Sequence, residues 1–418
     1  MKNFLFLAML ASVLPAAAAD LQTATSAVNQ LGLDLLPRTG APTENALLSP
    51  YSIQVALAMT YAGADGDTRT EMARILHFPS DDATLHASFA ALTQALAGAG
   101  AQQHQRNEQM RKYGEPSDEI ELRVANRLFG QQGYEFRTPF LDVLRTTYAA
   151  PFETLDFRHD PDGARRHING WVEEQTARKI LDLIPTGGLT NDTRLVLTNA
   201  LYFKAPWERS FEQAATAELP FRIRGNAPQD VPTMRKQFSL PYAKHRGFTA
   251  IALPYAGRDL QFLILLPDAP DGLAALEKEI TPELLAGCAT MNSQLVSLEL
   301  PKFKLQPPTL SLGRILQDLG LKTAFDQPRG SANFDRMAPR KPDDYLFIGE
   351  VFHKTFLALD EEGTEAAAAT AVAMMSGTAM HATPPKPIVV KVDRPFLFAI
   401  QHCGSGACLF LGRVTDPR

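Results

Sequence analysis

Residues 360–371 read DEEGTEAAAATA, and this stretch constrains the fold of the chain more than any other. Three acidic residues precede Gly363, and a run of uniformly small side chains follows Glu365. Small side chains bury too little apolar area to build a core, so the tract must serve another purpose. Because Glu and Ala favour helix, the tract taken alone indicates an exposed helix or a linker.

The rest of the chain has helical spacing in its first half and strand-like runs from residue 194 onward. Ser49 followed by Pro50 is a typical helix start, with a capping side chain and then a proline in the first turn. Residues 83–98 are expected to be helical, whereas 99–119, polar and interrupted by Gly and Pro, predict a loop or a frayed helix. No linker precedes residue 363 and no internal repeat occurs, so we expect one large α+β domain.

The bulk composition is that of an ordinary globular protein. The chain has 418 residues, of which 45% are hydrophobic and 21% charged, and its net charge is −5. A nucleic-acid-binding protein normally carries a strong basic bias, so nucleic acid is not an expected partner.

The N-terminus has the features of an export signal. Lys2 provides the positive start, residues 4–14 form an apolar run too short to span a membrane, and 15–19 are small. We therefore predict a signal peptide at 1–19, cleavage between Ala19 and Asp20, and a secreted or periplasmic product. No later apolar run reaches the length of a membrane span, so no membrane partner is expected.

Two of the three cysteines could form a disulfide. Cys403 and Cys408 flank the short stretch 404–407 between two strand-like runs, where a hairpin would bring them across from each other. In an oxidising compartment they could be bridged, and otherwise they are two free thiols on a turn. Cys288 has no evident partner and is expected to be a small buried residue.

The sequence contains no pattern typical of an enzyme. Nucleophile elbows, zinc-protease helices, phosphate-binding loops and dinucleotide fingerprints are all missing. The nine histidines do not fall at metal-ligand spacings, so no metal and no cofactor are expected. His353, taken alone, is expected to be a hydrogen-bonded core residue.

Several motifs together resemble the serpin family of protease inhibitors. Residues 352–355 (FHKT) and 360–370 resemble the segment that precedes and forms the serpin hinge. The same resemblance extends, in family order, through 45–53 (NALLSPYSI), 122–129 (LRVANRLF), 168–173 (INGWVE), 198–207 (TNALYFKAPW), 394–398 (RPFLF) and 409–414 (LFLGRV). The resemblance covers nearly the whole mature chain. From this resemblance together with the export signal at 1–19, we expect an exported bacterial member of the family.

The resemblance implies both a fold and a mechanism. The fold would be one domain over 20–418, with about three β-sheets, eight or nine helices and an exposed reactive-centre loop at about 363–387. A protease attacks this loop as a substrate, and the cleaved loop then enters the main sheet with the acylated protease attached. The implied hinge comprises Glu362, Gly363, Thr364, Glu365, Ala366, Ala367, Ala368, Ala369 and Thr370.

The hinge residues fit such an insertion. By the two-residue period of a strand, one face would carry Thr364, Ala366, Ala368 and Thr370. All four are small enough to enter a packed sheet without overpacking it. Glu365 would point outward, so no bulky or charged side chain blocks the early loop.

The family also implies a polar cluster beneath the sheet where the strands must part. The matching positions are Ser49, Ser52, Asn199 and His353, whose hydrogen bonds could be exchanged during opening. Trp207 matches the aromatic residue at the top of the opening, where the loop first enters.

The cleaved bond is less well defined than the hinge. The usual loop length counted from Gly363 gives Gly377–Thr378, whereas counting back from Pro395 leads to Thr383–Pro384. Nearby candidates are Met374, Met375, Ser376 and Met380.

The composition of the reactive-centre loop also indicates which class of protease could attack it. Residues 365–383 contain no Lys or Arg, which disfavours a trypsin-like protease because its pocket requires a cation. We expect a monomer that meets an elastase-, subtilisin- or chymotrypsin-like protease, or a papain-like cysteine protease. The alternative is a non-inhibitory serpin-like binding protein or chaperone.

Overall fold

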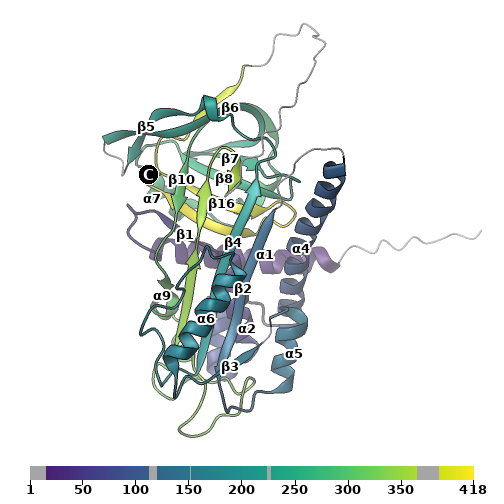
Figure 1. Ribbon diagram of the computed structural model, residues 1–418, viewed down its shortest axis with the longest axis vertical. Coiled ribbons are helices and arrows are strands. Elements are labelled where there is room, and N and C mark those ends of the chain that lie inside the picture. Colours follow the sequence, from purple (N-terminus) through teal and green to yellow (C-terminus); the bar gives the residue numbers. More distant parts are fainter. Residues whose placement is uncertain (1–15, 113–119, 151, 224–226, 365–385) are drawn as a thin grey trace, which may run out of the picture.

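The computed structural model describes residues 16–418 except 113–119, 151, 224–226 and 365–385 (Figure 1). Within this part the helices are α1 (Ala16–Leu35), α2 (Pro50–Tyr61), α3 (Gly66–Ile75), α4 (Asp82–Lys112), α5 (Thr138–Thr147), α6 (Pro161–Gln175), α7 (Leu273–Glu279), α8 (Pro282–Gly287) and α9 (Leu312–Asp318). The strands are β1 (Ala46–Leu48), β2 (Glu121–Gln131), β3 (Glu153–Leu155), β4 (Leu195–Pro206), β5 (Ala217–Ile223), β6 (Ala227–His245), β7 (Phe248–Pro254), β8 (Leu260–Pro267), β9 (Ser293–Pro301), β10 (Phe303–Leu305), β11 (Leu310–Ser311), β12 (Glu350–Thr355), β13 (Leu357–Leu359), β14 (Gly363–Thr364), β15 (Ile388–Lys391), β16 (Phe396–His402) and β17 (Cys408–Val414).

The strands form two large sheets. The main sheet has β4 at its centre, flanked by β2 on one side and by β12 and β14 on the other. The second sheet runs in the order β1-β17-β16-β8-β7-β6-β9-β15. Its long strand β6 pairs first with β5 and β9 and then with β7, so the β5-β6-β9-β15 part forms a third, partial sheet. The predicted α+β class is confirmed, with helices mainly in the first half and strands in the second.

Helices cover both faces of the main sheet (Figure 1). On one face α2 packs beneath β2 and β4, and every one of its residues is buried. It begins as its sequence predicts, since the Ser49 side chain accepts the backbone N–H of Ser52 and Pro50 is the first helical residue. On the other face α6 and the segment after it bury a separate hydrophobic cluster that includes Ile168, Val172 and Ile184.

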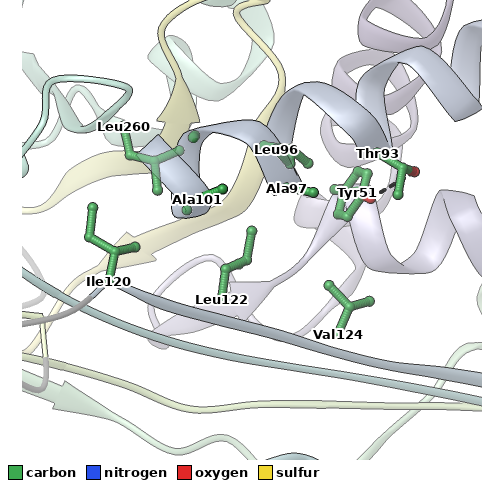
Figure 2. Close-up of a pocket in the computed structure, with 11 residues that line it drawn as sticks. Tyr51, Thr93, Leu96, Ala97, Ala101, Ile120, Leu122, Val124 and Leu260 are labelled. Atoms are coloured by element: carbon green, nitrogen blue, oxygen red, sulfur yellow. Dashed lines mark hydrogen bonds between the residues drawn. The ribbon is translucent and has the colours of Figure 1, made fainter. Parts of the chain in front are cut away.

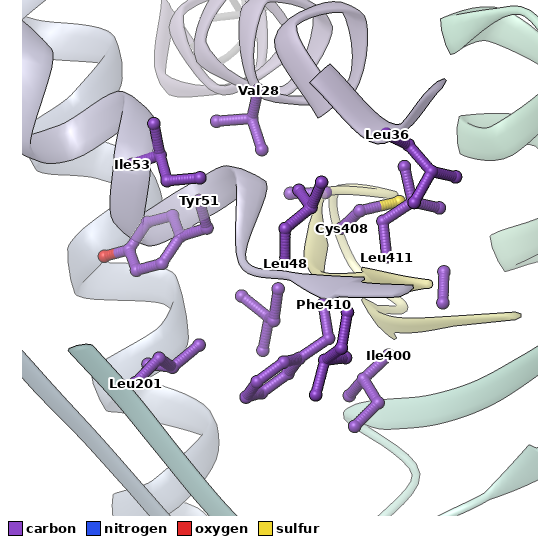
Figure 3. Packing of buried hydrophobic residues seen from close by; sticks show 14 of the residues in the cluster. Val28, Leu36, Leu48, Tyr51, Ile53, Leu201, Ile400, Cys408, Phe410 and Leu411 are labelled. Carbon is purple, nitrogen blue, oxygen red and sulfur yellow. The ribbon is translucent and has the colours of Figure 1, made fainter. Parts of the chain in front are cut away.

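The larger core joins the two ends of the chain. Val28 of α1, Leu48 of β1 and Ile53 of α2 pack with Phe410 and Leu411 of the last strand (Figure 3). In the second sheet the C-terminal strand β17 lies between β1 and β16.

One predicted boundary is wrong. The helix expected at 83–98 continues as α4 to Lys112, through most of the stretch predicted to be a loop or a frayed helix. The good helix formers Ala, Gln, Arg and Met in 99–112 outweigh the cost of Gly98 and Gly100, and α4 also packs against α1.

Of the two alternatives for Cys403 and Cys408, a disulfide or two free thiols, the structure has the free thiols. The strand register pairs Cys408 with Gln401, while Cys403 lies in the turn and its N–H bonds to the Asp259 carbonyl. Cys408 instead points into the core (Figure 3), and Cys288 is buried as expected. All three thiols are free.

The predicted signal-peptide cleavage falls within the first turn of α1, which begins at Ala16. Among the described helices, none combines the length and the apolar character needed to cross a membrane.

Candidate functional site

The two central strands of the main sheet, β4 and β12, are hydrogen-bonded to each other along one part of their length and separate beyond it. Over Glu350–Thr355 and Val196–Leu201, β12 and β4 pair in parallel. Beyond this point the chain continues as β13, which pairs with β10 and with the short strand β14. On its other edge β14 pairs with β4, so it lies between β13 and β4 at the top of the opening.

The first residues of the hinge are therefore already part of the sheet. Thr364 is fully buried, and its hydroxyl lies 2.6 Å from the Tyr255 hydroxyl. Gly363 is required at its position because a Cβ there would lie 2.1 Å from the Ala205 carbonyl oxygen. The hinge residues Glu365, Ala366, Ala367, Ala368, Ala369 and Thr370 lie outside the described residues, as do Met374, Met375, Ser376, Gly377, Thr378, Met380 and the Thr383–Pro384 bond.

A tight turn before β14 is held by Trp207. The indole N–H donates to the Asp360 carbonyl at 2.9 Å, and the Trp207 backbone N–H donates to the Glu362 carbonyl at 2.8 Å. Within the turn, the Asp360 carboxylate accepts the N–H groups of Glu362 and Gly363. The Trp207 ring stacks on Tyr255 at 4.7 Å, which links the turn to the contact made by Thr364.

Glu361 anchors the same turn through a buried carboxylate. Its Oε2 lies 2.7 Å from the Lys302 ammonium, and its Oε1 accepts the Thr216 hydroxyl at 2.7 Å. Burial opposes ionisation, but the hydrogen bonds from Lys302 and Thr216 outweigh it and hold the pKa of Glu361 below its usual value. The carboxylate is thus charged and satisfied at neutral pH.

His353 lies at the joined end of β12 and β4 and is fully buried. Its Nε2 accepts the backbone N–H of Ser49 at 3.1 Å, and its Nδ1 contacts Asn199 Oδ1. Since Nε2 is an acceptor, the proton of the neutral ring lies on Nδ1 and is donated to Asn199. Burial lowers the pKa of His353 to about 3, so the ring is neutral near pH 7.

The His353 network continues through a residue that was not predicted as part of it. Asn199 donates to Asn126 Oδ1 at 3.1 Å, and the Ser52 hydroxyl donates to the same oxygen at 2.7 Å. Asn126 in turn donates to the Ser52 carbonyl at 3.0 Å. Asn126 therefore joins β2, β4 and α2 through one side chain, at the level where the sheet must part.

Of the predicted site residues, the structure brings Ser49, Ser52, Asn199 and His353 together. Trp207 lies apart from them, at the opposite end of the opening beside the hinge turn. Sequence reasoning missed Asn126, Tyr255, Lys302 and Thr216. A polar residue within the strand motif LRVANRLF was a usable signal for Asn126, whereas nothing local marks Lys302 as the partner of Glu361.

The comparisons with known proteins agree with this geometry. A family model described as "Serpin (serine protease inhibitor)" matches residues 26–417. The chain belongs to the serpin family. This family is one of protease inhibitors and not of enzymes. Separately, the described residues contain no group of three His, Cys, Asp or Glu side chains placed to hold a metal ion.

This serpin is similar to proteins of several kinds. It is 37% identical to the leukocyte elastase inhibitor of Bos taurus over 90% of this chain and 94% of the relative. Among solved structures, Serpin48 of Tenebrio molitor has a TM-score of 0.75 and 31% identity, with coverage of 96% of this chain and 98% of that chain. Human thyroxine-binding globulin has a TM-score of 0.76 and 26% identity, with coverage of 95% and 99%.

The His353 site makes the stability of this serpin depend on pH. Unfolded histidine titrates near 6.5, so between about pH 6.5 and pH 3 the unfolded chain binds a proton that the folded chain does not. Acidification should therefore lower stability, by roughly 2–3 kcal/mol at pH 4.5 from this residue alone. We expect His353→Gln, which keeps a donor and an acceptor but does not titrate, to lose that share of the pH dependence.

The measurement is the urea midpoint of unfolding at pH 7.0 and pH 4.5. Wild type measured in parallel is the reference, because the two proteins share every other titratable group. If the difference in midpoint between pH 7.0 and pH 4.5 is the same in His353→Gln as in wild type, His353 is protonated at pH 4.5 in the folded protein as it is in the unfolded one.

Proposed function

We propose that this serpin is a suicide-substrate inhibitor of serine or cysteine proteases. The observation that carries the proposal is β14, whose two residues already lie between β13 and β4 as the start of an added strand. The residues that follow it in the sequence are small at every second position, so the strand can lengthen without overpacking the sheet.

In the proposed reaction the protease nucleophile attacks the carbonyl carbon of the residue before the cleaved bond. An ester or thioester forms to the protease, the peptide bond breaks, and the new amine leaves with the C-terminal part of the loop. The N-terminal part of the loop then extends β14 between β4 and β12. The acylated protease is displaced with it before water completes the hydrolysis.

The polar network around His353 lies on the path of this strand. The β4–β12 ladder must open there, and the contact between His353 and Asn199 must break because the two residues lie on opposite sides of the gap. Asn199 also bonds to Asn126, and His353 also accepts the N–H of Ser49, so each side chain has another polar neighbour when their mutual contact breaks. These neighbours lower the free-energy cost of parting the strands.

The target and the cleaved bond follow from the loop sequence. We propose an elastase-, subtilisin- or chymotrypsin-like target, or a papain-like one, since 365–383 offer no Lys or Arg. The similarity to a leukocyte elastase inhibitor supports the elastase-like choice. Gly377–Thr378 is the proposed bond, and Met374, Met375, Ser376 and Met380 are the other candidates.

The mature protein is proposed to be a monomer, residues 20–418, exported after loss of 1–19. The loop would span about 363–387. The relatives reported above come from cattle, an insect and human, so the expected bacterial origin finds no support in them.

Incubation of the full chain with pancreatic elastase and with subtilisin tests the proposal. An SDS-stable complex, with a released C-terminal peptide whose first residue is sequenced, is the expected result. Cleavage with no complex, and with no rise in thermal stability of the cleaved chain, would contradict inhibition and favour the binding or chaperone alternative.

A further inference from the structure

Asp344 forms a charged cluster just beyond the end of the β4–β12 ladder that lies away from β14, an end we call the foot. Its carboxylate accepts hydrogen bonds from the Tyr134 hydroxyl and the Arg158 guanidinium. The Arg194 Nε lies 3.6 Å from the same carboxylate oxygen. Burial opposes ionisation of Asp344, but the hydrogen bonds from Tyr134 and Arg158 outweigh it and hold its pKa below the usual value. The Asp344 cluster, made of these four residues, is therefore charged at neutral pH.

Three members of the cluster belong to the β2–β4 side of the opening. Arg194 directly precedes β4, and its guanidinium donates to the Asn191 carbonyl at 2.8 Å. Arg158 is held beside it, because the Asn191 side chain donates to the Arg158 carbonyl at 2.9 Å. Tyr134 follows β2, and the Arg158 guanidinium lies 5.8 Å from the centre of its ring. Since β2 pairs with β4, these residues move with both strands.

Asp344 belongs to the opposite side, in the segment that leads into β12. The hydroxyl of the neighbouring Tyr345 donates to Asp326 at 2.9 Å, and the Ile348 N–H donates to the Ala324 carbonyl at 2.9 Å. The segment is thus bonded within itself and continues into the strand. Asp344 reaches from it to the β2–β4 side, so the cluster spans the foot of the opening.

Apolar packing between the two sides is interrupted at the foot. A cavity of about 450 Å³ is lined by Thr193 and Val196 on the β4 side and by Phe347 on the β12 side. A second cavity, of about 530 Å³, extends beside Arg194 and Asp344. At these places the walls lack the dispersion contacts of a packed interior, so the charged contacts contribute more to holding the two sides together.

Arg158 is not fully hydrogen-bonded while the cluster is intact. Its Nε is buried and has no hydrogen-bond partner among the described residues. A buried donor without a partner lowers stability, and separation from Asp344 would let water reach it. Part of the cost of breaking the cluster is therefore recovered when the foot opens.

We propose that Asp344 is a positioning residue: it holds the foot of the main sheet closed, and its release sets the rate at which the inserting strand is completed. The part that concerns insertion rests on the proposed function. An added strand needs about 4.8 Å on either side, so parting β4 from β12 must carry Arg158 and Arg194 away from Asp344.

The outer edge of the β2–β4 side leaves room for this movement. Between α4 and β2 a cavity of about 330 Å³ is lined on the sheet side by Ile120, Leu122 and Val124 (Figure 2). The helix therefore does not hold β2 tightly at this level, and β2 can shift together with β4.

The register of β14 indicates which loop residues would meet the cluster. Thr364 lies opposite Ala205 in an antiparallel pair, so each later loop residue would lie opposite an earlier residue of β4. Met374 would thus lie opposite Leu195, the first residue of β4. Residues 375–377, which precede the proposed cleaved bond, would extend past it to the level of the Asp344 cluster.

Hydrogen exchange in the full chain, without protease, tests the opening itself. Asp344→Asn removes the charge that holds the two arginines. We expect the backbone amides of 195–201 and 350–355 to exchange roughly threefold faster than in wild type, the effect of one partly exposed ion pair. Circular dichroism and the thermal midpoint establish that the variant is folded.

Asp326→Asn is the matched control. Asp326 lies in the same segment and also accepts a tyrosine hydroxyl, but its partners are all on its own side: Tyr345, Gly330 and Ala332. The control should leave exchange in the β4–β12 ladder unchanged, whatever it does to the thermal midpoint. Equal exchange in Asp344→Asn and wild type, or the same acceleration in both variants, would overturn the role of Asp344.

Arg158→Gln tests the cluster from the opposite side, and it carries the test if Asp344→Asn does not fold. It should accelerate exchange in the same direction. In the double variant the acceleration should be smaller than the product of the two single effects, because both changes remove the same contact. Full multiplication of the two effects would show that the residues act independently.

The link to insertion is tested by the rate at which the SDS-stable complex appears at saturating elastase. We expect this rate to rise roughly threefold in Asp344→Asn and to stay unchanged in Asp326→Asn. If exchange accelerates while the rate of complex formation does not, the link to insertion is wrong. If wild type forms no complex, the proposed function fails, and the exchange result still decides whether Asp344 holds the foot closed.

Discussion

Thr364→Arg should convert this serpin from an inhibitor into a substrate. Thr364 is fully buried between two strands, and its hydroxyl meets Tyr255 at 2.6 Å. An arginine there would have to bury a charge within the packed sheet, at a cost of about 3–5 kcal/mol. Since about 1.4 kcal/mol is a factor of ten, the ratio of trapped to hydrolysed protease should fall by roughly 100-fold or more.

The measurement is the yield of SDS-stable complex per cleaved loop. Thr364→Ser is the matched control, because it keeps the hydroxyl for Tyr255 and the small size, and it should trap protease as wild type does. The rate at which the loop is cut should be similar in all three proteins. Trapping by Thr364→Arg at the wild-type yield would show that the sheet accommodates a charged side chain at position 364 during insertion.

Arg413→Met should strongly destabilise the folded chain. Arg413 is fully buried in β17, where it pairs with the Glu277 carboxylate at 3.1 Å. Its guanidinium also donates to the backbone carbonyls of Leu36, Gly40, Ala41 and Glu44. Removing it leaves the buried Glu277 carboxylate without its cation, which costs about 3–5 kcal/mol. The four carbonyls also lose a donor, although those of Leu36 and Ala41 keep the backbone N–H groups of Thr39 and Glu44.

The midpoint of thermal unfolding is the measurement, and a fall of several degrees is expected. The double variant Arg413→Met/Glu277→Gln should recover part of the loss, because it removes the orphaned charge. Arg145→Met is the control, since Arg145 pairs with Asp142 on an exposed helix face. A similar midpoint in Arg413→Met and Arg145→Met would mean that the buried pair contributes little.

The fold class and the start of the hinge were predictable because their signals are local. Ser49 before Pro50 marks a helix start wherever it occurs, and alternation of small residues after Gly363 is typical of a strand that must enter a packed sheet. The α4 boundary was predicted wrongly because its glycines indicated a break, whereas packing against α1 and good helix formers extended the helix. The spacing of Cys403 and Cys408 left a disulfide and two free thiols both open, and strand register, which sets Cys408 opposite Gln401, decided for the free thiols.

What the sequence by itself determined is the family, the arrangement of elements and the small side chains of the hinge, since each depends on residues near one another in the chain. Only the tertiary structure decided how far the hinge has entered the sheet, which lysine neutralises Glu361, and that Asn126 joins the His353 network. These features depend on contacts between residues distant in sequence. At Gly363 the distinction is sharpest: the sequence shows a glycine before a small-residue run, and the structure shows that it is needed because the Ala205 carbonyl leaves no room for a side chain.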